Sequence, residues 1–519
     1  VRLVGSEMCI RDSSNTAAGA NGHNGVGPIA APAGVHSFLR NHSPKEPPLM
    51  LRKSILSIAT LLGLAQAAHA ADVSSFTLDN GMDVVVLEDP RAPVVVHMVW
   101  YRTGAADEPP GVSGVAHYLE HLLFKGTEKL EPGEFSRVVA ANGGTDNAFT
   151  GQDYTAYFQR VASDRLGLMM EMEADRMRNL QLDGQDITTE RRVIQEERRQ
   201  RTENDPGALF GEQRSAAQYQ NHPYGIPVIG WMHEVEALEL QDALDFYETY
   251  YSPNNAILIV AGDVTPDDVR TLAEEHYGPI PTNPDLPERT RPQEPPQLAE
   301  RRLTFEDPRV AQPYVIRTYL APERDPGDQR TAAALTLLSD VLGQGQTSEL
   351  SRRLQFGTGE ALYASAFYGG TSLDDTTFGL VVVPAPGVSL EDAEAALDRE
   401  LADFIEDGVD PEQLDRIKMQ MRAAEIYEAD STQSLARRYG AALTSGLTIE
   451  DVEAWPGILQ SITGDEIVEA ARQVFDRRNA VTGYLTTPQD TAPAATATAP
   501  DPTPAANETV PQDPQEMTQ

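Results

Sequence analysis

The sequence predicts an α+β fold made of two tandem homologous domains, each an antiparallel-rich sheet flanked by helices. Three observations carry this prediction. Strand-like and helix-like segments alternate through residues 72–485, the order of these segments recurs in the second half, and a proline-rich stretch separates the halves. About 410 residues are long enough for two domains, each with its own core.

The first 70 residues are predicted to lie outside these two domains. Residues 1–49 have no periodic pattern and are interpreted as sequence upstream of a true start at Met50. The segment 50–70 has a basic beginning, a short apolar stretch and an A-x-A site at its end, the pattern of a secretory signal peptide. An uncleaved anchor is the less favoured alternative, because a membrane span needs roughly 20 apolar residues. We therefore expect export, to the periplasm of a Gram-negative bacterium, without a stable membrane anchor.

Composition excludes several classes of protein. The single cysteine, Cys9, lies in the upstream part, so the exported chain would have no disulfide, no thiolate metal site and no cysteine nucleophile. The net charge is −38; the first 70 residues contribute +3, which leaves −41 for residues 71–519. Such an acidic chain is not expected to bind nucleic acid. Residues 486–519 are rich in Pro, Ala and Thr and are predicted to be a disordered tail.

The N-terminal domain is placed at residues 72–278. Its first strands are predicted as a hairpin around Asn80-Gly81, a typical turn pair. A helix is expected between a Ser113 N-cap and a Gly126 C-cap, and a second long helix is expected to begin near Thr188 or Thr189.

Seven prolines between Pro279 and Pro296 predict an extended linker at 279–300, because proline disfavours helix interiors and central strands. The C-terminal domain, 301–485, reads as a diverged copy of the first. "GQDYTAYFQRV" pairs with "LDDTTFGLVVV", each an acidic turn followed by a strand. The second copy has no histidines at the matching places, so only the first could hold a metal.

The stretch "GVAHYLEHLLFKGT" carries the strongest chemical signal. On a helix, His117 and His121 project from one face one turn apart, a spacing that lets two imidazoles reach one zinc ion. Glu120 lies beside them and can hold a water molecule instead of the metal. This H-x-x-E-H order inverts the more common H-E-x-x-H motif with the same chemistry. The alternative is a core helix whose histidines bond to the backbone.

A catalytic zinc needs a third protein ligand and an open position for water. Glu190 and Glu197 lie two helical turns apart on one face of the second long helix, whereas Glu196 and Glu203 point elsewhere. Several arginines surround them, a pattern that on its own also fits a solvated, salt-bridged surface.

The pair "HYLEHLLFKGT" and "ERRVIQEE" resembles the pitrilysin/insulinase-like zinc peptidases, the family of the mitochondrial processing peptidase. The likeness runs from about residue 74 to 485 and includes "NGGTDNAFTGQDYTAYF", "HPYGIPVIGWMHEVEAL" and "YYSPNNAILIVAGDV". It implies that the two domains form half of a clam-shell chamber, as in the single-length bacterial type, which admits short or unfolded peptides.

The resemblance also implies roles for single residues. His117, His121 and Glu197 match the zinc ligands, Glu120 matches the general base, and Glu190 matches a glutamate behind the ligands. The segment Asn147, Ala148 and Phe149 matches the edge strand that accepts the substrate backbone. The expected cofactor is Zn²⁺ and the expected activity is that of a zinc metalloendopeptidase; the alternative is a peptide-binding or scaffolding subunit with little turnover of its own. A general structural repeat protein is disfavoured, because only one copy has the histidines.

One feature departs from the family pattern. Active members use an arginine and a tyrosine of a C-terminal half, seven positions apart. Here the position seven before Tyr363 is Phe356, and Arg353 lies ten before it. The pair is not recognisable, although Tyr363 or Tyr368 could substitute. The resemblance therefore implies a partner, either a related subunit or a second copy of this chain.

Overall fold

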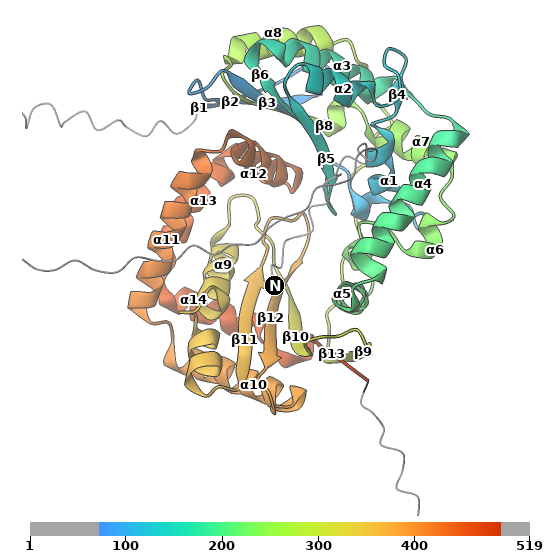
Figure 1. Cartoon of the computed structure of the whole chain (residues 1–519). Helices are drawn as coiled ribbons and strands as arrows, with labels where there is room; N and C mark the ends of the chain where they lie inside the picture. The colour runs from blue at the N-terminus through green and yellow to red at the C-terminus, as the bar shows by residue number, and fades with distance from the viewer. Residues whose placement is uncertain (1–71, 489–519) are drawn as a thin grey trace, which may run out of the picture.

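A computed structural model describes residues 72–488 as two α+β lobes that pack against each other (Figure 1). The predicted upstream segment, signal peptide and nearly all of the predicted tail lie outside the described residues. No helix between residues 72 and 488 is long and apolar enough to cross a membrane.

The first lobe is built on a six-stranded sheet in the order β1-β2-β8-β3-β6-β5, and β2 and β8 are its one parallel pair. The predicted hairpin is confirmed: Gly81, with φ +86°, turns the chain between β1 and β2. The strands are β1 (Asp72–Thr77), β2 (Asp83–Glu88), β3 (Val94–Tyr101), β5 (Thr145–Thr150), β6 (Thr155–Ala162) and β8 (Ala256–Gly262).

Eight helices of the first lobe follow or interrupt these strands, and the first three and the last of them pack most closely against the sheet. They are α1 (Val115–Leu122), α2 (Glu134–Ala141), α3 (Leu166–Arg178), α4 (Gly184–Arg198), α5 (Pro206–Gln218), α6 (Met232–Val235), α7 (Leu240–Tyr250) and α8 (Pro266–His276). A two-stranded ribbon joins β4 (Gly126–Thr127) to β7 (Leu180–Gln181).

The second lobe repeats the topology of the first. Its five-stranded sheet has the order β11-β12-β10-β13-β9, with β13 and β9 as the one parallel pair. Read from the parallel end, β9-β13-β10-β12-β11 corresponds strand by strand to β2-β8-β3-β6-β5. The strands are β9 (Arg301–Glu306), β10 (Tyr314–Ala321), β11 (Ala361–Tyr368), β12 (Thr376–Pro384) and β13 (Ala480–Thr486). The predicted internal repeat is thus present in the fold.

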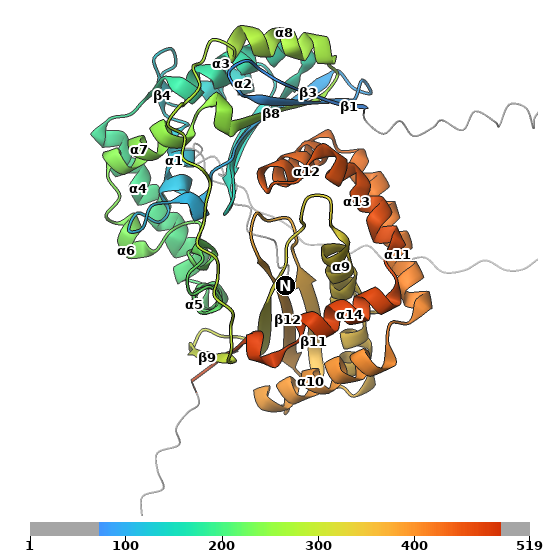
Figure 2. The ribbon, with the colours of Figure 1, turned by 180° about the vertical axis from the view of Figure 1, so that it is seen from behind.

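Helices of the second lobe cover the face of its sheet that points away from the first lobe, and one of them packs against the first lobe. They are α9 (Arg330–Gly343), α10 (Leu390–Asp407), α11 (Pro411–Ala429), α12 (Thr432–Thr444), α13 (Ile449–Ser461) and α14 (Gly464–Val474). Between the lobes, residues 281–300 contain no helix or strand and run as an extended linker along the back of the molecule beside α5 (Figure 2).

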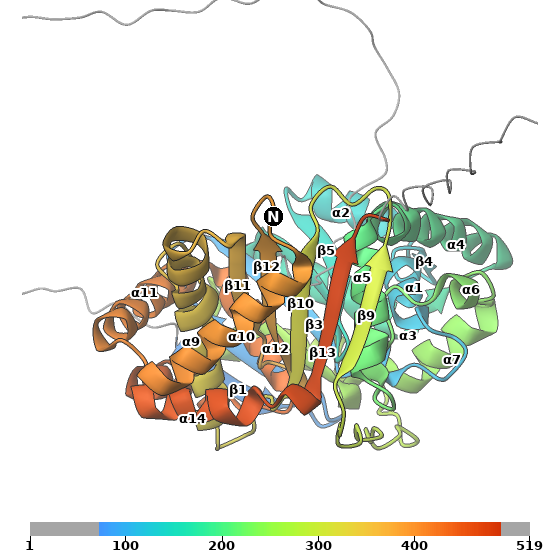
Figure 3. The same ribbon diagram turned by 90° about the horizontal axis from the view of Figure 1, so that it is seen from below.

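Each sheet has its second face covered by a helix of the other lobe. Helix α12 lies under the first sheet (Figures 1 and 2), where Leu435 and Tyr439 join a cluster with Trp100 and Ile259. In return, α5 lies against β13 and β9 (Figure 3), and Phe210 packs with residues of the second sheet. This reciprocal packing fixes the first sheet, and with it the edge strand β5, relative to the second lobe.

The contact between α12 and the first sheet is close enough to require glycine. A Cβ on Gly440 would lie 2.0 Å from Cε2 of Trp100, an indole that is almost fully buried. Gly440→Ala should therefore lower the free energy of unfolding by about 1–3 kcal/mol, the usual cost of overpacking. Thermal and denaturant unfolding of the purified chain would measure this.

Gly211→Ala is the matched control, because Gly211 lies in α5, the counterpart of α12, and has no atom within 4 Å of its added Cβ. It should raise stability by about 0.5–1 kcal/mol through the better helix propensity of alanine. Equal effects of the two changes would contradict the packing argument.

Candidate metal centre

Helix α1 carries the two histidines through the core of the first lobe. All eight of its residues are buried. The predicted Ser113 N-cap is wrong: Gly114, in the left-handed region at φ +89°, occupies that position, and Ser113 accepts a hydrogen bond from the Trp231 amide instead. The predicted Gly126 C-cap is also wrong, since the helix ends at Leu122 and Gly126 belongs to β4.

Glu108 replaces the missing cap from outside the helix. Its two carboxylate oxygens accept the Gly114 and Ala116 amides at 2.8 and 2.9 Å, which satisfies the unpaired donors at the start of α1. Burial raises the pKa of the Glu108 carboxyl well above its usual range. A residue of the preceding loop thus helps to set the position of the histidine helix.

Helix α4 brings the two glutamates against α1. It begins at Gly184, earlier than predicted, because Asp183 accepts the amides of Gln185 and Asp186 and forms a capping box. Thr188 bonds instead to the Gly184 carbonyl inside the helix, at 2.8 Å. After Arg198 the chain widens into one turn of π-helix, 199–203.

His117, His121 and Glu197 form the one group of potential metal ligands among the described residues, with ligand atoms within 4.8 Å of one another. Glu197 Oε2 lies 3.8 Å from His117 Nε2 and 3.4 Å from His121 Nε2. Ligand atoms about 2.0–2.2 Å from zinc lie roughly 3.3 Å apart in a tetrahedron. The observed spacing is therefore close to that of a zinc site.

The buried atoms of this cluster have no protein partner that satisfies them. His117 Nδ1 and Nε2, His121 Nε2 and Glu197 Oε2 are all buried without a hydrogen bond of ordinary geometry. Leaving so many buried polar atoms unpaired is costly, and buried polar groups are normally bonded. A divalent cation held by these three side chains would satisfy them, so the residues fit a zinc ion.

The electrostatics of the cluster also favour a bound cation. Burial lowers the pKa of His117 to about 3. Burial alone would also lower the pKa of His121, but the Glu190 and Glu197 carboxylates outweigh it and raise that pKa to about 9. The two carboxylates thus favour a positive charge beside His121, which a bound divalent cation would supply.

Side chains behind the ligands fix their orientation. Glu190 Oε2 lies 3.4 Å from His121 Nδ1, and Lys125 holds the other Glu190 oxygen at 2.5 Å. Arg201, from the π-helical turn, lies 2.8 Å from Glu197 Oε1, which leaves Oε2 directed at the histidines. Such supports commonly determine the affinity of a metal site. The sequence pattern gave no indication of Lys125 or Arg201.

Glu120 is fully buried beside the cluster, and burial raises the pKa of its carboxyl to about 7. Thr150 Oγ1 donates a 2.5 Å hydrogen bond to Glu120 Oε2, whereas Oε1 has no partner. A carboxyl group with a pKa near neutrality can both accept and release a proton in catalysis. The geometry therefore places a candidate base next to the candidate metal ligands.

Strand β5 forms the free edge of the first sheet, bonded on one side only, to β6. Asn147 is half-buried, but the side chains of Ala148 and Phe149 are fully buried. Phe149 packs edge-on against Trp100 and Tyr154 on the face of the sheet that α12 covers. Any contact of Ala148 or Phe149 with a peptide must therefore use their main-chain groups.

In the second lobe, the residues near the expected arginine–tyrosine pair make contacts within their own lobe or are exposed. Arg353 pairs with Glu349 and Asp407 of its own lobe, both at 3.0 Å. Phe356 and Tyr363 are exposed, at 58% and 41% of their surface, and Tyr368 donates to the Pro322 carbonyl at 2.5 Å. The helix α9, which occupies the place of α1, has no histidine.

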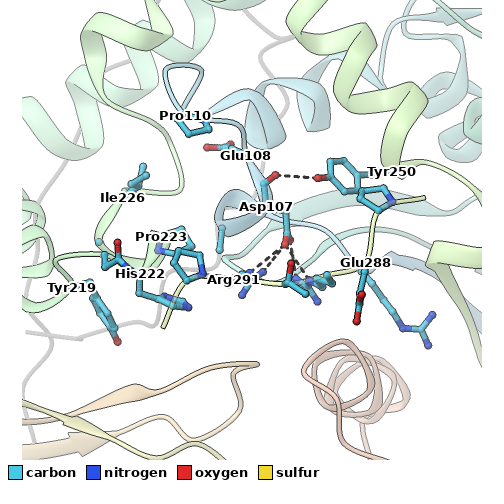
Figure 4. Close-up of a pocket in the computed structure, with 18 of the residues that line it drawn as sticks. Asp107, Glu108, Pro110, Tyr219, His222, Pro223, Ile226, Tyr250, Glu288 and Arg291 are labelled. Carbon is cyan, nitrogen blue, oxygen red and sulfur yellow. Dashed lines mark hydrogen bonds and ion pairs between the residues drawn. The ribbon is translucent and has the colours of Figure 1, made fainter. Parts of the chain in front are cut away.

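A pocket of about 540 Å³ lies between the first lobe and the linker and shares no lining residue with the metal cluster (Figure 4). Arg291 of the linker points at Asp107 and pairs with it at 2.9 Å, while the Tyr250 hydroxyl bonds to the Asp107 main-chain oxygen. Arg291 also reaches Asp153 at 2.6 Å and Asp374 of the second lobe at 2.9 Å. The linker therefore ties the two lobes together through buried ion pairs.

With this fold and site, the chain belongs to the insulinase family of peptidases, peptidase family M16. The model of that family matches residues 83–231, and a second model, described as the peptidase M16 inactive domain, matches residues 237–421. The first match contains the whole candidate metal centre.

Several relatives of this chain are named as zinc proteases. The zinc protease PqqE of Helicobacter pylori is 30% identical over 444 residues, covering 83% of this chain and 97% of that protein. The beta subunit of the mitochondrial-processing peptidase of Lentinula edodes is 24% identical, covering 81% and 92%.

Solved structures confirm the predicted fold class. The crystal structure of a protease from Helicobacter pylori matches with a TM-score of 0.75 at 28% identity, covering 80% of this chain and 99% of that one. The first half of the periplasmic protease PqqL of Escherichia coli matches with a TM-score of 0.70 at 21% identity, covering 80% and 92%. The fold of this chain is thus that of one clam-shell half.

The site predicts a graded response of zinc binding to mutation. The wild-type chain should hold about one zinc, and His117→Ala, His121→Ala or Glu197→Ala should abolish it, because three protein ligands are the minimum for such a site. Glu190→Gln should weaken binding by roughly 10–100-fold, since it removes only the support of His121. Metal analysis after dialysis and competition with a chelator would measure both effects.

Glu196→Gln is the matched control, because Glu196 is exposed and bonds only to Arg199 and Gln200 on the outer face of α4. It should leave zinc binding unchanged. Loss of zinc on this change, with Glu197→Gln tolerated, would show that the third ligand is one position earlier.

Proposed function

We propose that the chain is a zinc-dependent endopeptidase that cleaves short or unfolded peptides. The observation that carries the proposal is the buried set of His117, His121 and Glu197, whose ligand atoms lack protein partners while the Glu120 carboxylate lies beside them. The names of the M16 relatives support the same class of activity.

Zinc in this site would polarise the peptide carbonyl and lower the pKa of a bound water towards about 7. Glu120 would take the proton of that water at its free oxygen and later deliver it to the leaving amine. The pKa of the Glu120 carboxyl, about 7, suits both steps at neutral pH.

The proposed substrate is an extended peptide added as a further strand along β5. The free edge of β5 supports this, because main-chain hydrogen bonds along a sheet edge bind a peptide largely independently of its sequence. With Ala148 and Phe149 buried, the strand offers the peptide mainly backbone and the partly exposed Asn147. Side-chain selectivity would then come from other walls of the chamber.

The second candidate is a peptide-binding or scaffolding subunit with little turnover. The unrecognised arginine–tyrosine pair favours it. Against it stands the complete set of three ligands and a buried base, since a subunit that only binds peptides has no need of a base. We therefore place it second.

We infer in addition that the chain acts with a partner and outside the cytoplasm. The expected arginine and tyrosine are not recognisable near Tyr363, so a related subunit that carries the pair, or a second copy of this chain, would complete the site. Export to the periplasm rests on the signal-peptide pattern at 50–70.

Glu120→Gln separates catalysis from metal binding. The amide keeps the shape of the side chain but cannot serve as a base, so zinc content should stay at about one per chain while turnover falls by roughly 10²–10⁴-fold. Metal analysis alongside cleavage of a fluorogenic peptide would test this. Loss of zinc from this variant would mean that Glu120 is a ligand.

The partner proposal predicts that the chain alone binds zinc but cleaves peptides poorly. Each missing transition-state donor costs about 10²–10³ in rate, so addition of a related subunit with the arginine–tyrosine pair should raise kcat by at least that factor. Steady-state kinetics with and without the subunit would measure the gain. Full activity of the chain in isolation, as monomer or homodimer, would rule out the need for a different subunit.

A further inference from the structure

The candidate base is joined to the peptide-binding edge by one side chain. Thr150 is the last residue of β5 and is 1% exposed, and its hydroxyl donates to Glu120 Oε2 at 2.5 Å. Hydrogen bonds to a buried carboxylate are stronger than those between neutral groups. No other hydrogen bond to the Glu120 side chain is present among the described residues.

This bond makes the two oxygens of Glu120 different. Oε2 is anchored by Thr150, whereas Oε1 is buried and lacks a protein partner, like both nitrogens of His117 and Nε2 of His121. A hydroxyl donor can serve Oε2 both when the carboxyl is ionised and when Oε1 carries a proton. Proton transfer can therefore take place at Oε1 without breaking the anchor.

The backbone around Thr150 is fixed by contacts along the β5–β6 hairpin. It pairs with Thr155 across β5 and β6, and the next residue, Gly151, accepts the Ala105 amide at 3.0 Å. Two residues further, the Asp153 carboxylate accepts Arg291 of the linker at 2.6 Å and the Leu373 amide of the second lobe at 3.1 Å. The hydroxyl is thus fixed relative to both lobes.

We propose that Thr150 is a positioning residue that directs Oε1 of Glu120 at the reacting water and keeps it there through the catalytic cycle. The inference rests on the proposed peptidase function. In the first step a water O–H bond breaks and its proton goes to Oε1 as the oxygen adds to the peptide carbonyl carbon. In the second the C–N bond breaks and the same proton passes to the leaving nitrogen. Thr150 keeps its own proton throughout.

Thr150→Val is the decisive variant, because it keeps the shape and removes the hydroxyl. In the zinc-loaded chain, with any partner subunit that activity requires, kcat should fall by roughly 10–100-fold, the usual penalty for a small misplacement of a reacting group. KM and zinc content should stay within about two-fold. Thr150→Ser, which keeps the donor, should restore kcat to within about three-fold of the wild type.

Thr155→Val is the matched control. Thr155 faces Thr150 in the same hairpin, is equally buried, and its hydroxyl donates to the Thr103 carbonyl instead of a carboxylate. Its kcat should be unchanged. A rise in KM with constant kcat on Thr150→Val would show that Thr150 only shapes the substrate strand, and would overturn the inference, as would equal loss of kcat in the two valine variants.

A measurement without turnover separates this inference from the proposed function. The infrared difference between wild-type and Glu120→Gln protein isolates the Glu120 carboxyl band, which should shift in Thr150→Val and not in Thr155→Val. An unshifted band overturns the inference whether or not the chain cleaves peptides, whereas absence of turnover from the zinc-loaded wild-type chain together with its partner subunit overturns the peptidase proposal. If Thr150→Val does not fold, Thr150→Ser and Thr150→Ala replace it. A low kcat in Thr150→Ala with a normal kcat in Thr150→Ser supports the inference. A low kcat in both variants contradicts it.

Discussion

The structure depends on one constraint, the burial of several lone pairs that the protein does not satisfy. Two imidazoles on α1 and a carboxylate on α4 meet in the core with their ligand atoms unpaired. Such an arrangement is unfavourable unless a cation neutralises it, because buried charges and polar atoms need partners. Surrounding contacts hold these atoms in place although their burial is unfavourable. They include the Glu108 cap of α1 and the ion pairs of Lys125 and Arg201.

The duplicated topology explains how the edge strand β5 can be unpaired on one side and still be rigid. An edge strand is free to accept a peptide but is prone to fraying or mispairing. Here the face of the first sheet is sealed by α12, with Gly440 against Trp100, and the tip of the β5–β6 hairpin is tied to the second lobe through Asp153 and Arg291. The described part of the second lobe has no group of candidate metal ligands, but it thereby contributes to the order of β5.

Local sequence rules were less reliable at helix ends than in helix interiors. The spacing of His117 and His121 was sufficient to place both on one face, since that depends only on helical periodicity. The start of α1 was misplaced because its amides are bound by Glu108, which lies six positions before Gly114 and outside the usual N-cap position. Likewise, β5 is an edge strand, but the burial of Phe149 follows from α12, some 290 positions along the chain.

The sequence by itself determined the two-fold repeat, the position of the linker and the ligand spacing, because periodicity, proline content and residue type act over short distances. The tertiary structure alone decided which supports surround the ligands. Thr150 reaches Glu120 across 30 positions, and Arg291 reaches Asp153 across 138. Such pairings form only when sheets and helices pack together in the folded chain. A local sequence pattern does not show which residues so far apart will meet. The same closure buried the cluster and shifted the pKa of Glu120 towards neutrality.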